Sequence, residues 1–193
     1  MSVSLLCPGN SLHDTPLWAF DAELVVLLNA AIRIPVVRCA SARLTNEWRW
    51  AITDREGWDR LRDNVSINSW APTLWSPDWI RVVDDAVYDG LTKLRMPMEA
   101  IRKAALWAGE AGQWEFSSMT RVIVALVEER LPDEETRRWK QIDIFGCDLS
   151  PGGGYYGTDL VEYGTRDRWS KERGVYQRLV RLAGNRGVKI RRV

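Results

Sequence analysis

The chain has 193 residues, of which 46% are apolar and 27% charged, and its formal net charge is +1. This composition is typical of a globular protein, and the near-zero charge excludes a general basic surface for nucleic acid. We expect a single domain over residues 1–193, with an insertion at about 64–115. No apolar run approaches the ~20 residues that cross a bilayer, and the first residues lack the pattern of a secretory signal.

The cysteine and histidine content argues against a structural zinc site. Cys7, Cys39 and Cys147 are odd in number and far apart, and His13 is the one histidine. No Cys-x-x-Cys pair occurs. We expect reduced thiols and a cytoplasmic protein.

Short apolar runs in the first third of the chain predict strands. Val3–Cys7 and Glu23–Leu28 are dense in Val and Leu, as in strands that are covered on both faces. Arg49–Thr53 predicts another strand, and Val36–Cys39 a short strand or an extended link. The helical spacing of apolar residues in "REGWDRLRD", at 55–63, predicts a helix.

The middle of the chain is rich in tryptophan and proline. Residues 64–78 contain two prolines and predict a long loop or inserted flap. An edge strand at Ile80–Val83, a short helix at Asp85–Leu94 and a partly helical Met96–Gly112 follow. Eleven tryptophans occur in all, which we interpret as core and interface residues, with stacking platforms for a base or sugar as the alternative.

The last third contains the clearest helix. An apolar stripe at helical spacing runs through Phe116–Leu131, with Ser117 and Ser118 as candidate N-caps. The elements that we expect after it are a strand at Ile142–Phe145, a helix at Arg168–Ala183 and a strand at Gly187–Val193.

The alternation of strands and helices predicts an α/β domain with a mostly parallel sheet flanked by helices. The carboxyl ends of parallel strands share one edge of the sheet, where ligands usually bind. The polar or small residues that follow the predicted strands are Gly9-Asn10, Asn29, Asp54 and Gly146-Cys147-Asp148. We therefore expect them to lie close together.

The first of these loops predicts a phosphate site. Ser11 can cap a helix that begins near Leu12, and the unpaired backbone N–H groups of such a helix start attract anions. Gly9 would allow a phosphate to approach the backbone closely. Gly-Asn-Ser also occurs in ordinary turns, so the loop alone does not decide between the two interpretations.

The order of these motifs resembles the MptE-like family, which includes the archaeal 6-hydroxymethylpterin diphosphokinase, and the bacterial sialyltransferases of the Campylobacter type. Gly9-Asn10-Ser11-Leu12 is similar to the second half of their first loop, and Asn29, Asp54 and Gly146-Cys147-Asp148-Leu149 are similar to their later strand ends. Ser117-Ser118 stands where these families have small hydroxyl residues at a helix start. The resemblance implies a Rossmann-like fold and a nucleotide pocket.

The chain departs from these families in two places. Cys7 stands where their first glycine would be, which puts the phosphate cradle in doubt. The sialyltransferases use a histidine base in the second half of the chain, where this sequence has none. The resemblance therefore implies a nucleotide pocket more than it implies one reaction.

Two carboxylates are candidate catalytic groups. Asp54 and Asp148 could hold Mg²⁺ against phosphate oxygens, or one of them could act as a base on an acceptor hydroxyl. Capping of the following helix or turn is the alternative. His13 could serve as acid or base near neutral pH, or be only structural.

A glycine-rich loop at 152–157 contains Tyr155 and Tyr156, and it predicts either a lid over a ligand or a plain surface loop. The resemblance implies that these tyrosines contact the donor phosphate. Asn10 and Asn29 could hydrogen-bond a ribose or phosphate, or be turn residues. The residues that we expect at a nucleotide are Gly9, Asn10, Ser11, Asn29, Ser117, Ser118, Gly146, Tyr155 and Tyr156.

The sequence contains no Walker motif and no Gly-x-Ser-x-Gly elbow, and no dinucleotide fingerprint follows the first strand. Our leading hypothesis is a nucleotide-binding transferase, with a glycosyltransferase that uses a nucleotide sugar ahead of an ATP-dependent diphosphokinase of the hydroxymethylpterin type. Mg²⁺ is a candidate cofactor. A non-catalytic nucleotide-binding accessory protein and a homo-oligomer with tryptophans at its interface are the alternatives.

Overall fold

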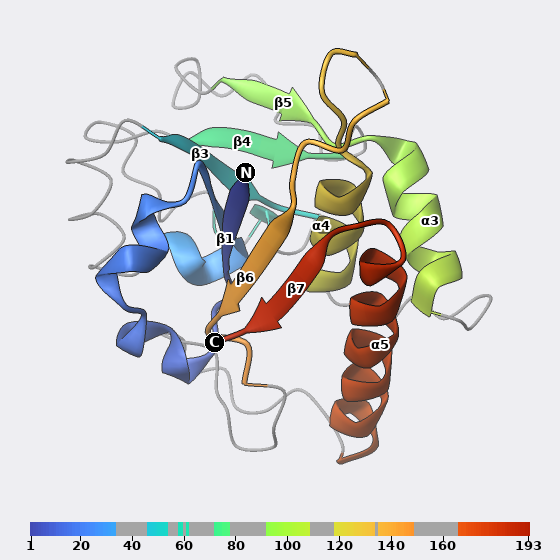
Figure 1. Ribbon diagram of the computed structural model, residues 1–193. Coiled ribbons are helices and arrows are strands. Elements are labelled where there is room, and N and C mark those ends of the chain that lie inside the picture. Colours follow the sequence, from blue (N-terminus) through green and yellow to red (C-terminus); the bar gives the residue numbers. More distant parts are fainter. Residues whose placement is uncertain are drawn as a thin grey trace.

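A computed structural model describes residues 1–33, 46–53, 58–59, 61, 72–77, 92–108, 118–133, 135–148 and 166–193. These residues form an all-parallel sheet of seven strands in the order β5-β4-β3-β2-β1-β6-β7 (Figure 1). The strands are β1 (Ser2–Leu6), β2 (Leu24–Leu28), β3 (Glu47–Ala51), β4 (Thr73–Ser76), β5 (Lys93–Arg95), β6 (Gln141–Phe145) and β7 (Lys189–Arg192). The predicted α/β fold with a parallel, Rossmann-like sheet is confirmed.

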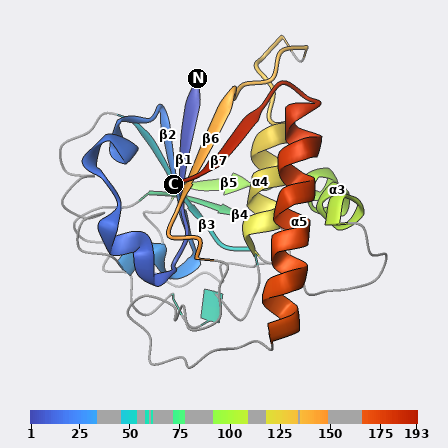
Figure 2. The same cartoon turned by 60° about the horizontal axis from the view of Figure 1, so that its bottom comes forward.

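The two faces of the sheet are covered by different kinds of structure. Helices α3 (Met98–Ala108), α4 (Ser118–Glu128) and α5 (Arg166–Gly184) lie together on one face. The described cover of the other face includes the 3-10 segments η1 (Asn10–Asp14), η2 (Leu17–Asp21) and η3 (Asn29–Arg33). Figure 2 shows the three α-helices on one side of the strands and the blue 3-10 segments on the opposite side.

Successive side chains of the central strands point alternately into the two cores. In β2, Leu24 and Val26 belong to the core under the α-helices, while Val25 and Leu27 belong to the core under the 3-10 segments. All five residues of β2 are buried, which explains why its sequence is a continuous apolar run rather than an alternating one. The edge strand β7 shows the opposite pattern, since Ile190 is its one buried residue and its other three side chains are charged and exposed.

Most predicted elements are confirmed, but two strands in the middle of the chain were not predicted. Thr73–Ser76 is strand β4, although it falls in the predicted loop at 64–78. Lys93–Arg95 is strand β5, where the end of a helix was predicted. Both strands are too short to show a period, and Pro72 and Pro77 stand just outside the ends of β4, where proline is tolerated.

The described residues within 64–115 contribute β4, β5 and α3 to the sheet and its helical layer. The predicted strands at 36–39 and 80–83 lie outside the described residues, as does most of the helix predicted at 55–63. The interpretation of tryptophans as core residues is confirmed for most of those described, with Trp18 the exception at 49% exposure. Within the described part of the chain, no helix has the length and apolar character required to cross a membrane.

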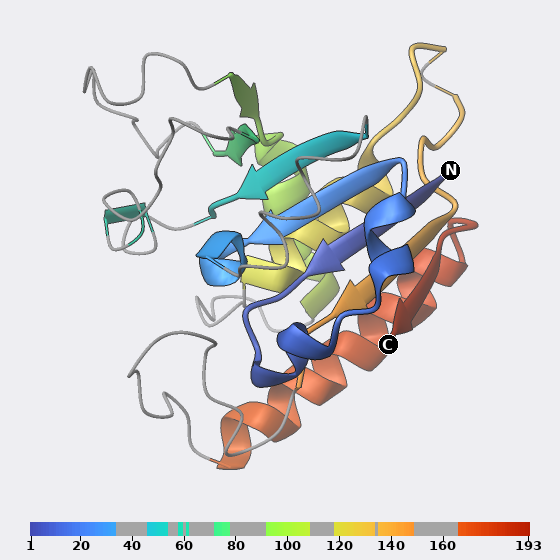
Figure 3. The ribbon, with the colours of Figure 1, turned by 90° about the vertical axis from the view of Figure 1, so that its left-hand side faces the viewer.

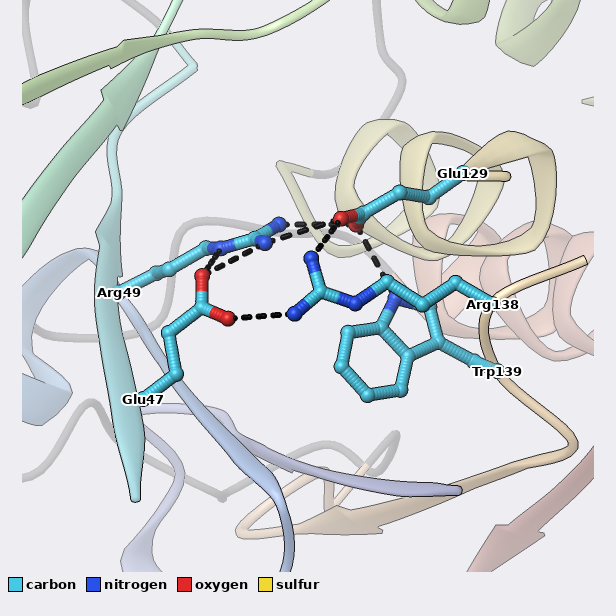
Figure 4. Close-up of polar contacts among 5 residues, drawn as sticks. All are labelled: Glu47, Arg49, Glu129, Arg138 and Trp139. Atoms are coloured by element: carbon cyan, nitrogen blue, oxygen red, sulfur yellow. Dashed lines mark hydrogen bonds and ion pairs between the residues drawn. The ribbon is translucent and has the colours of Figure 1, made fainter. Parts of the chain in front are cut away.

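A ring of charges closes the amino-terminal edge of the sheet (Figure 4). Arg49 of β3 is 2% exposed and binds Glu129 through two hydrogen bonds of 2.8 and 2.9 Å. Arg138 also donates to Glu129, at 2.8 Å, and to Glu47 at 2.7 Å. Arg49 in turn donates to Glu47 at 2.7 Å, which closes the ring. Trp139 donates its indole N–H to Glu129 at 3.0 Å. The ring therefore joins β3 to the segment between α4 and β6, across the two intervening strands.

The ring predicts a strong dependence of stability on one buried cation. R49M should lower the free energy of unfolding by about 3–5 kcal/mol, because it removes a buried, paired cation and leaves the half-buried Glu129 carboxylate with two of its four hydrogen bonds. R130M is the matched control, since Arg130 is exposed, and it should change stability by no more than about 0.5 kcal/mol. Urea unfolding at neutral pH measures both. Equal losses in the two variants would contradict the structural role of the ring.

The same ring predicts acid sensitivity. Burial raises the pKa of the Glu129 carboxyl, but its bonds to Arg49 and Trp139 outweigh this effect and hold the pKa below its ordinary value. A carboxyl with a lowered folded-state pKa contributes its full stability above the unfolded-state pKa, and this contribution is lost as the pH falls through the folded-state pKa. Urea midpoints should therefore fall below about pH 5. E129Q should start from lower stability and show a shallower fall, and an unchanged slope in E129Q would contradict the assignment.

Candidate functional site

The strand order reverses between β1 and β6, which makes this pair the topological switch point of the sheet. From β1 the chain proceeds to β2 on one side, and β6 and β7 lie on the other. Ligands of open α/β sheets bind outside the carboxyl ends of the strands at such a point. Figure 3 shows these ends on one side of the molecule, with the loop after β1 passing beside the end of β6. Two of the predicted site motifs, at Gly9 and at Gly146–Asp148, follow these two strands.

The two loops are in backbone contact. The Gly9 N–H donates to the Gly146 carbonyl at 2.9 Å, which extends the β1–β6 ladder beyond the strands. A side chain on Gly9 would overlap that carbonyl and come within 2.7 Å of Asp148 Oδ2. Gly146 has a φ of +64°, and a side chain there would overlap the Cys7 carbonyl. Both positions therefore require glycine for a reason within the protein.

Asp148 is held by the loop after β1. The Ser11 hydroxyl donates to Asp148 Oδ1, and the Ser11 N–H points to Oδ2 at 3.4 Å. The prediction that Ser11 caps a helix at Leu12 is wrong: the segment is the 3-10 turn η1, and Gly9 stands at its N-cap with no side-chain bond. The Leu12 N–H donates to the Gly9 carbonyl at 3.1 Å. These amides are thus engaged within the protein, and a carboxylate lies where we expected a phosphate.

The N-terminus of α4 lies at the same edge. Met119 Sδ is 3.2 Å from Cys147 Sγ in the loop after β6. Arg121, one turn into the helix, donates to the Thr53 carbonyl after β3 at 3.1 Å. Ser118 is the first residue of this 11-residue helix, so the prediction that it lies at a helix start is confirmed. The positive end of the helix dipole is therefore beside Cys147 and Thr53.

Buried polar atoms without hydrogen-bond partners follow three neighbouring strands. They are Asn29 Oδ1 after β2, Thr53 Oγ1 after β3 and Ser76 Oγ at the end of β4. Thr53 and Ser76 are 0% exposed. An unsatisfied buried group of this kind costs about 1–3 kcal/mol. Three such atoms at one edge of the sheet point to a ligand that would satisfy them.

Asn29 illustrates how the fold uses a predicted site residue twice. Its φ is +46°, so its backbone makes the left-handed turn that the sequence analysis gave as the alternative to binding. Its backbone carbonyl accepts the indole N–H of Trp50 at 2.9 Å. Its side-chain oxygen, by contrast, has no hydrogen-bond partner. Thr53 and Ser76 were missed, although the signal was available: each is a small polar residue where a strand ends.

The other predicted site residues are placed only in part. His13 lies in η1 with its Nε2 3.1 Å from Asp14 Oδ1, and both side chains are exposed. The backbone of Asn10 opens η1, but its side chain lies outside the described residues. Four further predicted residues lie entirely outside the described residues: Asp54, Ser117, Tyr155 and Tyr156. A joint Mg²⁺ site of Asp54 and Asp148 therefore stays a prediction, and the described part of the chain shows no cluster of three His, Cys, Asp or Glu side chains able to hold a metal.

Comparison with protein-family models, curated proteins and solved structures finds no match to this chain. The site therefore has to be interpreted from its own geometry.

The close contact between the two loops predicts that a glycine-to-alanine change destabilises the protein at Gly9 and Gly146 but stabilises it at an open position. G9A should destabilise the fold by about 1–3 kcal/mol, because the backbone of one loop must shift. G146A adds the penalty of a positive φ. G174A is the control, since nothing lies within 4 Å of its new methyl group in the middle of α5, and it should stabilise by about 0.5–1 kcal/mol. Thermal unfolding measures all three, and a neutral G9A would show that the loops are not locked together.

Proposed function

We propose that this chain is a nucleotide-binding transferase that uses a nucleotide-sugar donor. The observation that carries the proposal is the presence of three features along the carboxyl edge of the sheet: the α4 N-terminus, the unpartnered Thr53 hydroxyl and the Ser11–Asp148 pair. In this proposal the donor diphosphate lies against the N-terminus of α4, where helix N–H groups and the dipole favour an anion. Asn29 and Thr53 then bind hydroxyl groups of the ribose.

The position of Asp148 supports separate places within this site for phosphate binding and for proton transfer. Its carboxylate would repel a phosphate at the loop after β1, so the phosphate and the carboxylate have to occupy separate parts of the edge. The Ser11 hydroxyl donates a hydrogen bond to the Asp148 carboxylate and orients it. We propose that Asp148 accepts the proton of an acceptor hydroxyl as that oxygen attacks the sugar carbon, while the nucleotide leaves as the phosphate anion. This role would replace the histidine that the resembling sialyltransferases use.

Diphosphate transfer from ATP is the second candidate. The observation that favours it is the pairing of a hydroxyl and a carboxylate at Ser11 and Asp148, because Mg²⁺ prefers such oxygen ligands. In that case Asp148 would hold the metal against the phosphates. A protein that only sequesters the nucleotide is the third outcome, and recovery of intact ligand after long incubation would identify it.

Calorimetry with CMP-, UDP- and GDP-sugars, and with ATP in the presence and absence of Mg²⁺, tests these proposals. We expect one nucleotide sugar to bind without Mg²⁺, and binding only of ATP with Mg²⁺ would favour the diphosphokinase. D148N should retain the nucleotide sugar and lose its turnover by about 10²–10⁴-fold. D133N is the matched control, since Asp133 lies in the turn between α4 and β6 at the opposite edge. Absence of binding by every nucleotide would overturn the proposal.

T53V separates ligand binding from folding in the same experiment. Valine has nearly the shape of threonine, so removal of an unsatisfied buried hydroxyl should leave the stability unchanged or higher. The same change should weaken nucleotide binding, because the ligand loses a hydrogen bond. A variant that is destabilised but binds normally would show that the Thr53 hydroxyl has a structural partner instead.

A further inference from the structure

Three sulfur atoms meet behind the carboxyl edge of the sheet. Cys7 follows β1, Cys147 follows β6 and Met119 is the second residue of α4. Cys147 Sγ is 3.2 Å from Met119 Sδ. Cys7 packs in the same buried cluster as these two residues, and it follows strand β1, which pairs with β6. All three residues are at least nine-tenths buried. Neither cysteine forms a disulfide in this structure.

The three sulfurs are carried by rigid elements rather than by one adaptable loop. The Cys7 N–H donates to the Phe145 carbonyl at 2.8 Å, and the contact between Gly9 and Gly146 continues that ladder. Gly146 leaves no space between the two cysteine-bearing segments, since a side chain there would overlap the Cys7 carbonyl. Met119 is fixed by the first turn of α4. The donor atoms are therefore preorganised by β1, β6 and α4 together.

The chemistry of this donor set is selective. Two thiolates and one thioether are soft ligands, which favour copper(I) over the hard cations Mg²⁺ and Ca²⁺. Hydrophobic packing of free cysteines explains each burial separately. It does not explain why sulfur-bearing side chains that follow β1, follow β6 and begin α4 meet in one buried cluster.

We propose that Cys7, Cys147 and Met119 form a binding site for a soft monovalent metal ion of the copper(I) class. Binding forms two bonds from copper to thiolate sulfur and one to the thioether, and it releases the two thiol protons to solvent without any change of oxidation state. The nearby Asp148 carboxylate adds a negative charge that attracts the cation. The inference does not depend on the proposed nucleotide.

Cysteine binds a metal as the thiolate, so copper(I) has to displace the proton of each thiol. A bound ion would also tie the loop after β1 to the start of α4.

The experiment uses the full chain with C39S, so that the remaining cysteines are the two of the site. The reduced protein is titrated anaerobically against the copper(I)–bicinchoninate complex. We expect one equivalent of copper(I) to transfer to the protein, with a thiolate-to-copper absorption band in the ultraviolet and a rise in Tm. C147S should abolish the transfer. M119L, which keeps the volume of the side chain, should weaken copper binding at least about tenfold while it retains the fold.

Matched outcomes keep the inference open to refutation. H13A should bind copper as C39S does, because His13 is not among the donors. Copper that stays with bicinchoninate, or that transfers equally to C147S, would overturn the proposal. Equal affinity in C39S and in M119L would reduce the site to a simple pair of thiols and would also overturn it. None of these readouts involves a nucleotide, so their failure is distinct from failure of the proposed function.

Discussion

The hydrogen bond between Gly9 and Gly146 is the constraint on which the carboxyl edge of this protein depends. It extends the pairing of β1 and β6 past the point where the strands end, and it leaves no space for a side chain on either residue. Because this bond holds the two loops together, it brings Asp148 close to Ser11. Cys147, in the same loop as Asp148, packs instead against Met119 of α4.

The two edges of the sheet satisfy their polar groups in different ways. At the amino-terminal edge, Arg49 is buried and Glu129 half-buried, and each has several charged or hydrogen-bonding partners. At the carboxyl edge, Thr53 and Ser76 are buried with no partner for their hydroxyls. This contrast is why we propose a structural role for the charge ring and ligand binding at the carboxyl edge.

Much of the architecture could be predicted from the sequence, because its signals are local. The continuous apolar run of β2 and the helical stripe of α4 are both distinct enough to recognise. The short strands β4 and β5 carry no such signal, and their place in the sheet is decided by pairing with β3 and with each other. The connection after β1 was predicted as an α-helix because Ser11 looks like a cap, but its hydroxyl has a stronger partner in Asp148, which is 137 residues away. The switch point could be expected from strand-end residues, whereas the charge ring could not, since Arg49 and Glu47 lie 80 and 91 residues before their partners Glu129 and Arg138.

The two faces of the sheet have different covers, and they should therefore differ in how readily they open locally. Long α-helices hold one face through many internal hydrogen bonds, while five-residue 3-10 turns cover much of the other and contribute few. Amide protons under η1 and η2 should therefore exchange with solvent through small local openings, and those of α4 only through global unfolding. The 3-10 segments begin directly after Gly9. A ligand that binds at the switch point would therefore contact the face of the sheet whose cover opens at the lowest free-energy cost.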